Sequence, residues 1–234
     1  MPVYYGIDIW YLILILPELV LSVYAQFKVK STYAKYAKVM SRRGMTANDA
    51  VSFILRNNGI TDVSVQPVAG ELTDHYSPKE KIIRLSEGVF GKTSVAALGI
   101  AAHEAGHTVQ HYSNYGPINF RNALVPVANL GSVLAMPLIL IGFVFNFSTL
   151  INLGIIFFAT ATLFQLVTLP VELNASSRAM KALESSGALN DEELKMTKKV
   201  LTAAALTYVA ALAVSFAQLL RLILISSGRS NRRR

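Results

Sequence analysis

Long apolar stretches separated by polar segments dominate the pattern of this 234-residue chain. A helix that crosses a bilayer needs about 20 mainly apolar residues. Residues 4–27, two parts of 122–171, and residues 200–225 meet that requirement. The segment 122–171 holds fifty residues without a charged side chain, which is enough for two spans. We therefore expect a helical hairpin that turns within residues 146–152.

Shorter periodic patterns occur in the polar segment 28–121, between the first two spans. A capping-box pattern at residues 46–49 predicts a short amphipathic helix that ends near residues 58–59. A second helix is expected to start near residues 93–94 and to continue towards Tyr112.

Two stretches of the same segment, residues 62–68 and 81–86, have the composition and alternation of strands. Residues 74–78 lie between them and contain aspartate, serine and proline, which predicts a turn. A block of this size has a thin core. We therefore expect it to pack against the membrane helices rather than to fold alone.

The composition is that of a membrane protein. Hydrophobic residues make up 53% of the chain and charged residues only 15%, against roughly a quarter in soluble domains. The absence of cysteine excludes disulfides and any cysteine-based zinc site. The net charge of +8 fits a topology signal or contact with anionic lipid. It accompanies no nucleic-acid-binding motif, so we expect no nucleic-acid partner.

The sequence His-Glu-Ala-Gly-His at residues 103–107 carries the candidate chemistry. In a helix, His103 and His107 lie one turn apart on the same face, where two imidazoles can bind one Zn²⁺. Glu104 beside them can act as the base that activates the attacking water. The pattern predicts a zinc-dependent hydrolase, most simply a peptidase. A chance occurrence on an ordinary helix is the alternative.

A catalytic zinc site needs a third protein ligand and one open position. The metzincin pattern would require glycine at position 110 and histidine at position 113, but the chain has Gln110 and Ser113. A carboxylate from a later helix is the remaining common solution. The acidic residues that follow the motif are Glu172, Glu184, Asp191, Glu192 and Glu193.

Glu172 is the acid that we expect to complete the site. It is the first charge after fifty uncharged residues and lies at a membrane boundary, where an ionisable group is costly unless it is paired or functional. It also falls on the same side of the membrane as His103 and His107. A helix cap or an interfacial salt bridge is the alternative role, and the other four acids are expected on the solvated surface of a polar loop.

Four further side chains are weaker candidates. His111, one turn further along the histidine face, can hydrogen-bond, shuttle a proton or stabilise an oxyanion, but we favour an interfacial polar residue. His75 lies in the expected turn and is more simply a loop histidine than a substrate contact. Tyr76 and Arg178 are weaker still as oxyanion donors. Arg178, six residues after Glu172, is off the helix face of that acid.

Three motifs together carry a family resemblance. They are residues 103–110 (HEAGHTVQ), residues 74–76 with 84–86, and residues 170–176 (PVELNAS). With these motifs the chain resembles the YugP-type neutral zinc metallopeptidases, which are small prokaryotic integral membrane proteins, over nearly its whole length. The resemblance implies a zincin-like peptidase that binds one zinc ion through His103, His107 and Glu172, with Glu104 as base.

The chain is more distantly similar to the HtpX/Ste24-type membrane proteases, in which an aspartate commonly follows the ligand glutamate by four residues. That position is Ser176 here, so Ser176 or Asn174, or an acceptor from elsewhere, would have to receive the imidazole N–H. The wider zincin group also implies an edge strand that aligns the peptide substrate. Residues 81–86 fit that role, or else form one strand of a closed hairpin.

Together these patterns predict a mainly α membrane protein with four transmembrane helices. A small α+β zincin-like metallopeptidase module at residues 28–121 would lie between spans 1 and 2. Residues 172–199 would form a helix with the third ligand and a polar loop, and residues 226–234 a basic tail.

The expected function is that of an integral membrane zinc endopeptidase acting on unfolded or membrane-associated polypeptides. The alternative is a non-catalytic scaffold with a structural metal, whose site would be closed by a fourth protein ligand such as His111. A transporter is a weaker interpretation. Asp8 and Glu18 are the only acids well inside a span, and the pattern shows no pair of broken helices.

Charge also bears on topology. The first span has no lysine or arginine before it, so we expect a retained anchor rather than a signal peptide. The basic residues that follow this span and those within 172–199 lie on one side, which the positive-inside rule assigns to the cytoplasm. The arginines of the tail argue for the opposite orientation. We expect an active site on the cytoplasmic side of a prokaryotic cell membrane.

Overall fold

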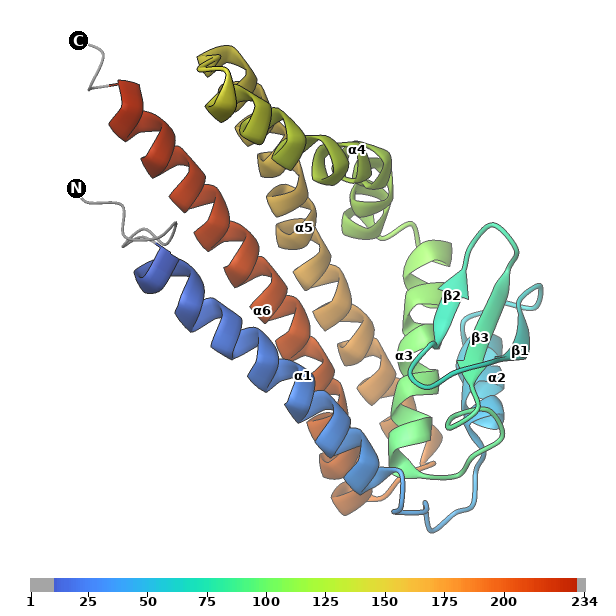
Figure 1. Cartoon of the computed structure of the whole chain (residues 1–234). Coiled ribbons are helices and arrows are strands. Elements are labelled where there is room, and N and C mark those ends of the chain that lie inside the picture. The colour runs from blue at the N-terminus through green and yellow to red at the C-terminus, as the bar shows by residue number, and fades with distance from the viewer. Residues whose placement is uncertain (1–10, 231–234) are drawn as a thin grey trace. The chain divides into compact units, whose positions relative to one another are not determined.

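The computed structural model describes residues 11–230. The start of the expected first span, with Asp8, and the last four residues of the tail therefore lie outside the described residues. The described chain is mainly helical with three short strands (Figure 1). Its elements are a π-helical segment η1 (Tyr11–Ile15), α1 (Leu16–Tyr36), α2 (Ala47–Asn57), β1 (Ser64–Val68), β2 (His75–Ser77), β3 (Ile82–Ser86), α3 (Val95–Tyr112), α4 (Gly116–Val144), α5 (Ser148–Ser186) and α6 (Asp191–Ser230).

Four helical segments are long and apolar enough to cross a membrane: Leu12–Tyr36, α4, α5 and Asp191–Ser227 of α6. The helices α4 and α5 form the expected pair, linked by residues 145–147, where Asn146 adopts a left-handed φ of 59°. The helix α5 continues through Pro170 to Ser186. Residues 172–199 are therefore the end of this long helix, a short link and the start of α6.

The chain divides into two compact units. The first contains residues 1–26, 120–169 and 207–234, and the second contains residues 27–119 and 170–206. The second unit thus includes the end of α5 and the start of α6 in addition to the segment 28–121.

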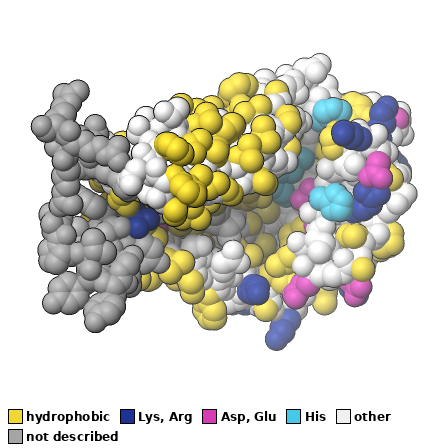
Figure 2. Space-filling model, turned by 45° about the horizontal axis from the view of Figure 1, so that its top comes forward, with side chains coloured by type: hydrophobic (Ala, Val, Ile, Leu, Met, Phe, Trp, Pro, Cys, Tyr) yellow, Lys and Arg dark blue, Asp and Glu magenta, His cyan; other side chains and the backbone are white. Residues whose placement is uncertain are grey.

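Small residues hold the helices of the first unit close together. A Cβ added at Gly154 would lie 2.8 Å from the carbonyl oxygen of Ala135, so α4 and α5 meet backbone to backbone there. The hydroxyls of Thr162 and Ser215 lie 2.8 Å apart and link α5 to α6. Large apolar side chains such as Val133 remain exposed, and hydrophobic side chains cover these helices on the face drawn in Figure 2. This combination is typical of helices that pack in lipid.

The second unit has a three-stranded sheet with α2 and α3 packed around a common core. The central strand β3 pairs with β1 in parallel and with β2 antiparallel. Ile83 and Leu85 of this strand are fully buried, together with Leu98 of α3. The core therefore fixes the position of α3 against the sheet.

One expectation about this sheet is wrong, and one open alternative is decided. Residues 75–77 of the expected turn form the strand β2, because they pair with residues 82–84. Of the two alternatives for residues 81–86, the structure has the hairpin strand, because β3 pairs antiparallel with β2. It is not an edge strand, since β3 has a partner on each side. The short edge strands are β1 and β2.

One expected surface acid is also buried. Glu193 is only 5% exposed. Its carboxylate accepts hydrogen bonds from the backbone N–H groups of Arg42 and Asn190, and the Asn190 side chain accepts one from the Glu193 N–H. The residue therefore caps the start of α6 instead of lying on a solvated surface.

The expected capping box is present at the start of α2. The Thr46 hydroxyl accepts a hydrogen bond from the Asp49 N–H at 3.1 Å, and the Asp49 carboxylate accepts one from the Thr46 N–H at 3.2 Å. We expect Thr46→Ala to lower the free energy of unfolding by about 1 kcal/mol, measured by thermal unfolding in detergent. Thr46→Ser keeps the hydroxyl and should retain most of that stability. Equal losses in both variants would contradict this account of the cap.

Candidate metal centre

The helix α3, which carries both motif histidines, is closely packed by its neighbours. Ser94 caps the helix by accepting a hydrogen bond from the Ala97 N–H at 3.2 Å. Small side chains along the buried face, including Ala101, Ala102 and Ala105, are fully buried. Because they add little bulk, neighbouring elements can approach the helix closely.

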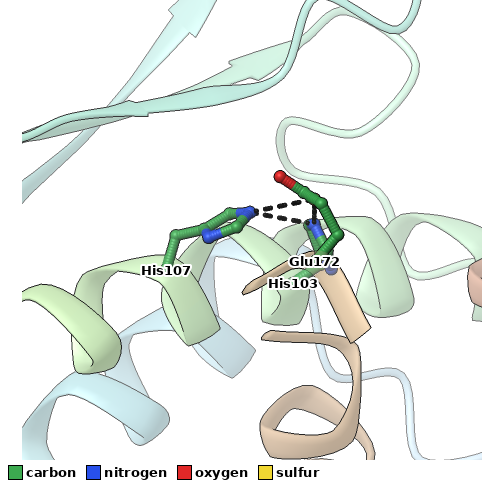
Figure 3. Close-up of side chains that lie close together, drawn as sticks. All are labelled: His103, His107 and Glu172. Carbon is green, nitrogen blue, oxygen red and sulfur yellow. Dashed lines mark hydrogen bonds and ion pairs between the residues drawn. The ribbon is translucent and has the colours of Figure 1, made fainter. Parts of the chain in front are cut away.

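Three potential ligand atoms converge beside this helix (Figure 3). The Nε2 atoms of His103 and His107 lie 3.1 Å apart. One carboxylate oxygen of Glu172 lies 3.2 Å from the first and 3.4 Å from the second. Ligand atoms around a tetrahedral zinc ion are about 3.3 Å apart, as zinc–ligand distances near 2.0–2.1 Å require. The three atoms thus have the spacing of three corners of such a tetrahedron.

Glu172 reaches the histidines because α5 passes unusually close to α3. A Cβ on Gly106 would lie only 2.7 Å from the carbonyl oxygen of Ala175. Only a glycine fits there unless the two backbones move apart. The glycine between the two histidines therefore sets the distance at which α5 delivers the carboxylate.

In both histidines, the ring nitrogen that faces away from the cluster has a polar partner. Nδ1 of His103 lies 3.1 Å from the Ser176 hydroxyl, and Nδ1 of His107 lies 3.0 Å from the side-chain oxygen of Gln110. Asn174 has no such contact with a ring. It accepts hydrogen bonds from the side chains of Gln110 and Arg178.

Sequence patterns do not identify Gln110 as a functional residue. Together with Ser113 it departs from the metzincin pattern. Its position three residues after His107, on the same side of a helix, is the one signal that could have pointed to it.

The charge environment of the site favours a cation. Burial of the ring works to lower the pKa of His107, but the carboxylates of Glu172 and Glu104 outweigh this effect and raise the pKa above its usual value. Glu104 itself is 9% exposed and lies on α3 directly after His103. A buried carboxylate with two imidazoles is a donor set that suits a divalent metal ion.

His111 contacts Tyr76 rather than the cluster. The Tyr76 hydroxyl and Nδ1 of His111 lie 3.2 Å apart, linking β2 to α3. Burial raises the pKa of Tyr76 to about 12, helped by the nearby Tyr112 and Asp62. The phenol is therefore protonated at neutral pH and can donate to the ring.

The two remaining candidates have partners of their own. Nδ1 of His75 lies 2.8 Å from the carbonyl oxygen of Thr73, within its own loop, and the residue is exposed. Arg178 donates from Nε to Asn174 at 2.8 Å, and its guanidinium lies 5.7 Å from the centre of the Tyr115 ring.

This geometry defines a cluster of two histidines and one glutamate that could hold a metal ion, in a chain with four helices long and apolar enough to cross a membrane. The family model described as "Putative neutral zinc metallopeptidase" matches residues 11–227, so the chain belongs to this family. The chain is 47% identical over 215 residues to "Putative membrane protease YugP" of Bacillus subtilis (strain 168), covering 92% of this chain and 96% of the relative. No solved structure matches it. The family resemblance expected from the three motifs is confirmed.

The close contact at Gly106 leads to a test. We expect Gly106→Ala to push α3 and α5 apart and to weaken zinc binding by roughly 10- to 100-fold, as when the support of a metal ligand is lost. Titration of the purified protein with zinc against a competing chelator measures this. Gly116→Ala is the control, because a Cβ there meets nothing within 4 Å. Equal zinc affinity in both variants would contradict the role assigned to the close approach.

Proposed function

We propose that this protein is an integral membrane endopeptidase that uses one zinc ion held by His103, His107 and Glu172. The observation that carries the proposal is the tetrahedral spacing of the three ligand atoms, 3.1, 3.2 and 3.4 Å, in a member of a zinc metallopeptidase family. The histidine side chains keep 15% and 12% of their surface exposed, which supports access for a substrate from one side.

In the proposed mechanism the zinc ion and Glu104 have separate roles. Zinc at this position would polarise the scissile carbonyl and lower the pKa of the attacking water. Glu104 would accept a proton from that water and then deliver it to the nitrogen of the leaving amine. Tyr76 of β2 and His111 of α3 form a separate hydrogen-bonded pair, and we assign them no step.

An open metal site distinguishes this proposal from the scaffold alternative. A structural zinc site would be closed by a fourth protein ligand. Over residues 11–230, the cluster groups His103, His107 and Glu172, and Nδ1 of His111 is engaged by Tyr76. A set of three protein ligands leaves one position for water, as hydrolysis requires.

The substrate that we propose is an extended polypeptide, unfolded or associated with the membrane. The edge strand β2 packs against α3 through Tyr76 and His111, and β3 is its one strand partner in the described sheet. Its other edge can add an extended peptide by backbone hydrogen bonds, a role that replaces the one expected for residues 81–86. The basic residues after the first span favour a site on the cytoplasmic side of a prokaryotic membrane.

Replacement of the base tests the mechanism. We expect Glu104→Gln to lower peptide hydrolysis by roughly 100- to 10,000-fold, because the amide cannot accept the proton, while the zinc content stays unchanged. Cleavage of a quenched fluorescent peptide library in detergent, with zinc determined by atomic emission, measures both quantities. The control is Glu184→Gln, the same change at an exposed position of α5. Wild-type cleavage rates in Glu104→Gln would sink the proposed mechanism.

Replacement of the third ligand tests the metal set. In Glu172→Gln the neutral amide no longer balances the charge of the ion, so we expect the purified protein to lose most of its zinc on dialysis. Zinc content per chain before and after dialysis is the measurement, again with Glu184→Gln as control. Full retention of zinc by Glu172→Gln would remove this residue from the ligand set.

A further inference from the structure

Gln110 is a fully buried polar side chain that the chemistry above does not use. It lies on α3 and makes three hydrogen-bond contacts. Its Nε2 donates to the carbonyl oxygen of Val171 at 2.8 Å and to Oδ1 of Asn174 at 3.0 Å, and its Oε1 lies 3.0 Å from Nδ1 of His107. The amide therefore joins one histidine of the cluster to the helix that carries Glu172.

The orientation of the Gln110 amide follows from the guanidinium of Arg178, which can only donate hydrogen bonds. Arg178 donates from Nε at 2.8 Å to the side chain of Asn174. A guanidinium has no acceptor, so the Asn174 atom that faces it must be the oxygen. The same oxygen faces Gln110, which must then present its NH₂ group, as the carbonyl oxygen of Val171 also requires.

The orientation of the Gln110 amide determines which ring nitrogen of His107 carries a proton. With its NH₂ group held by two oxygens, Gln110 can present only its carbonyl oxygen to Nδ1 of His107. That ring nitrogen must therefore carry a proton. In the neutral ring, the lone pair is then on Nε2, the atom that lies 3.1 Å from Nε2 of His103 and 3.4 Å from the Glu172 carboxylate.

We propose that Gln110 is a positioning residue that fixes His107 in the Nδ1–H tautomer, with Arg178 and Asn174 holding the amide in the required orientation. The proposal rests on the metal site proposed above but not on peptide hydrolysis. It also gives Arg178 a task other than the oxyanion contact considered from the sequence. His103 differs, because the Ser176 hydroxyl can donate or accept and so does not specify a tautomer by itself.

Two replacements at position 110 separate positioning from simple packing. Gln110→Met keeps the length of the side chain but offers no comparable acceptor to His107. Gln110→Glu keeps an acceptor for His107 but loses both donors and places a carboxylate against the oxygens of Val171 and Asn174. If Gln110 served only to pack α3 against α5, Gln110→Glu should be at least as damaging as Gln110→Met.

The experiment measures zinc affinity and thermal unfolding of the full-length protein in detergent. We expect Gln110→Met to bind zinc roughly 10- to 100-fold more weakly, and Gln110→Glu to remain within about 3-fold of wild type because it keeps the acceptor. The control is Thr197→Val, which removes the buried 3.1 Å hydrogen bond from α6 to the Val95 carbonyl. It should lower the unfolding temperature and leave zinc affinity unchanged. Wild-type zinc affinity in Gln110→Met, or equal losses in both variants at position 110, would overturn the proposal.

A measurement on the unsubstituted protein keeps the proposal testable even if the variants do not fold. Nitrogen-15 spectra of the zinc-loaded, histidine-labelled protein should show His107 protonated at Nδ1, and the opposite tautomer would refute the proposal. A wild-type protein that binds no zinc would instead refute the metal site. Wild-type hydrolysis in Glu104→Gln would bear only on the mechanism, so the three failures are distinguishable.

Discussion

The close approach of α3 and α5 is the constraint on which the rest of the site depends. Gly106 and the backbone of Ala175 meet at a distance that no other residue type at position 106 would allow. The Glu172 carboxylate, one turn before this contact, thereby reaches both imidazoles. Neither helix has a complete ligand set, so the cluster exists only where these two segments, far apart in sequence, lie side by side.

Four polar residues of α5, at every second position from 172 to 178, act in two pairs at this contact. Glu172 and Ser176 are one turn apart on one face and approach His103, the first through its carboxylate and the second through its hydroxyl. Asn174 and Arg178 form the second pair, which holds Gln110. One stretch of helix thus supplies a candidate ligand and polar support for both histidines, which satisfies groups that would be costly to bury alone.

The sequence allowed prediction of features that depend on neighbouring residues. The capping box at Thr46, the helix start at Ser94 and the apolar segments of α4 and α5 follow from local patterns, and the structure has all of them. Features that depend on distant partners were missed. The strand β2 is too short to show a period. Gln110 has two of its three partners more than sixty residues away. Glu193 is buried because it accepts from the backbone of Arg42, 151 positions earlier. The grouping of His103, His107 and Glu172 was expected because few later acids were available, which is an argument about composition rather than local geometry.

The spacing of the cluster also bears on the stability of the second unit. The site places two imidazole nitrogens and a carboxylate oxygen within 3.4 Å of one another. Without a metal ion, a proton kept between the carboxylate and an imidazole stabilises this contact, in line with the raised pKa of His107. A divalent cation would take the place of that proton, and its binding energy would add to the stability of the second unit. Metal uptake and the packing of α5 on α3 would then be thermodynamically linked, so that a chain loaded with metal would hold this contact more firmly than an empty one.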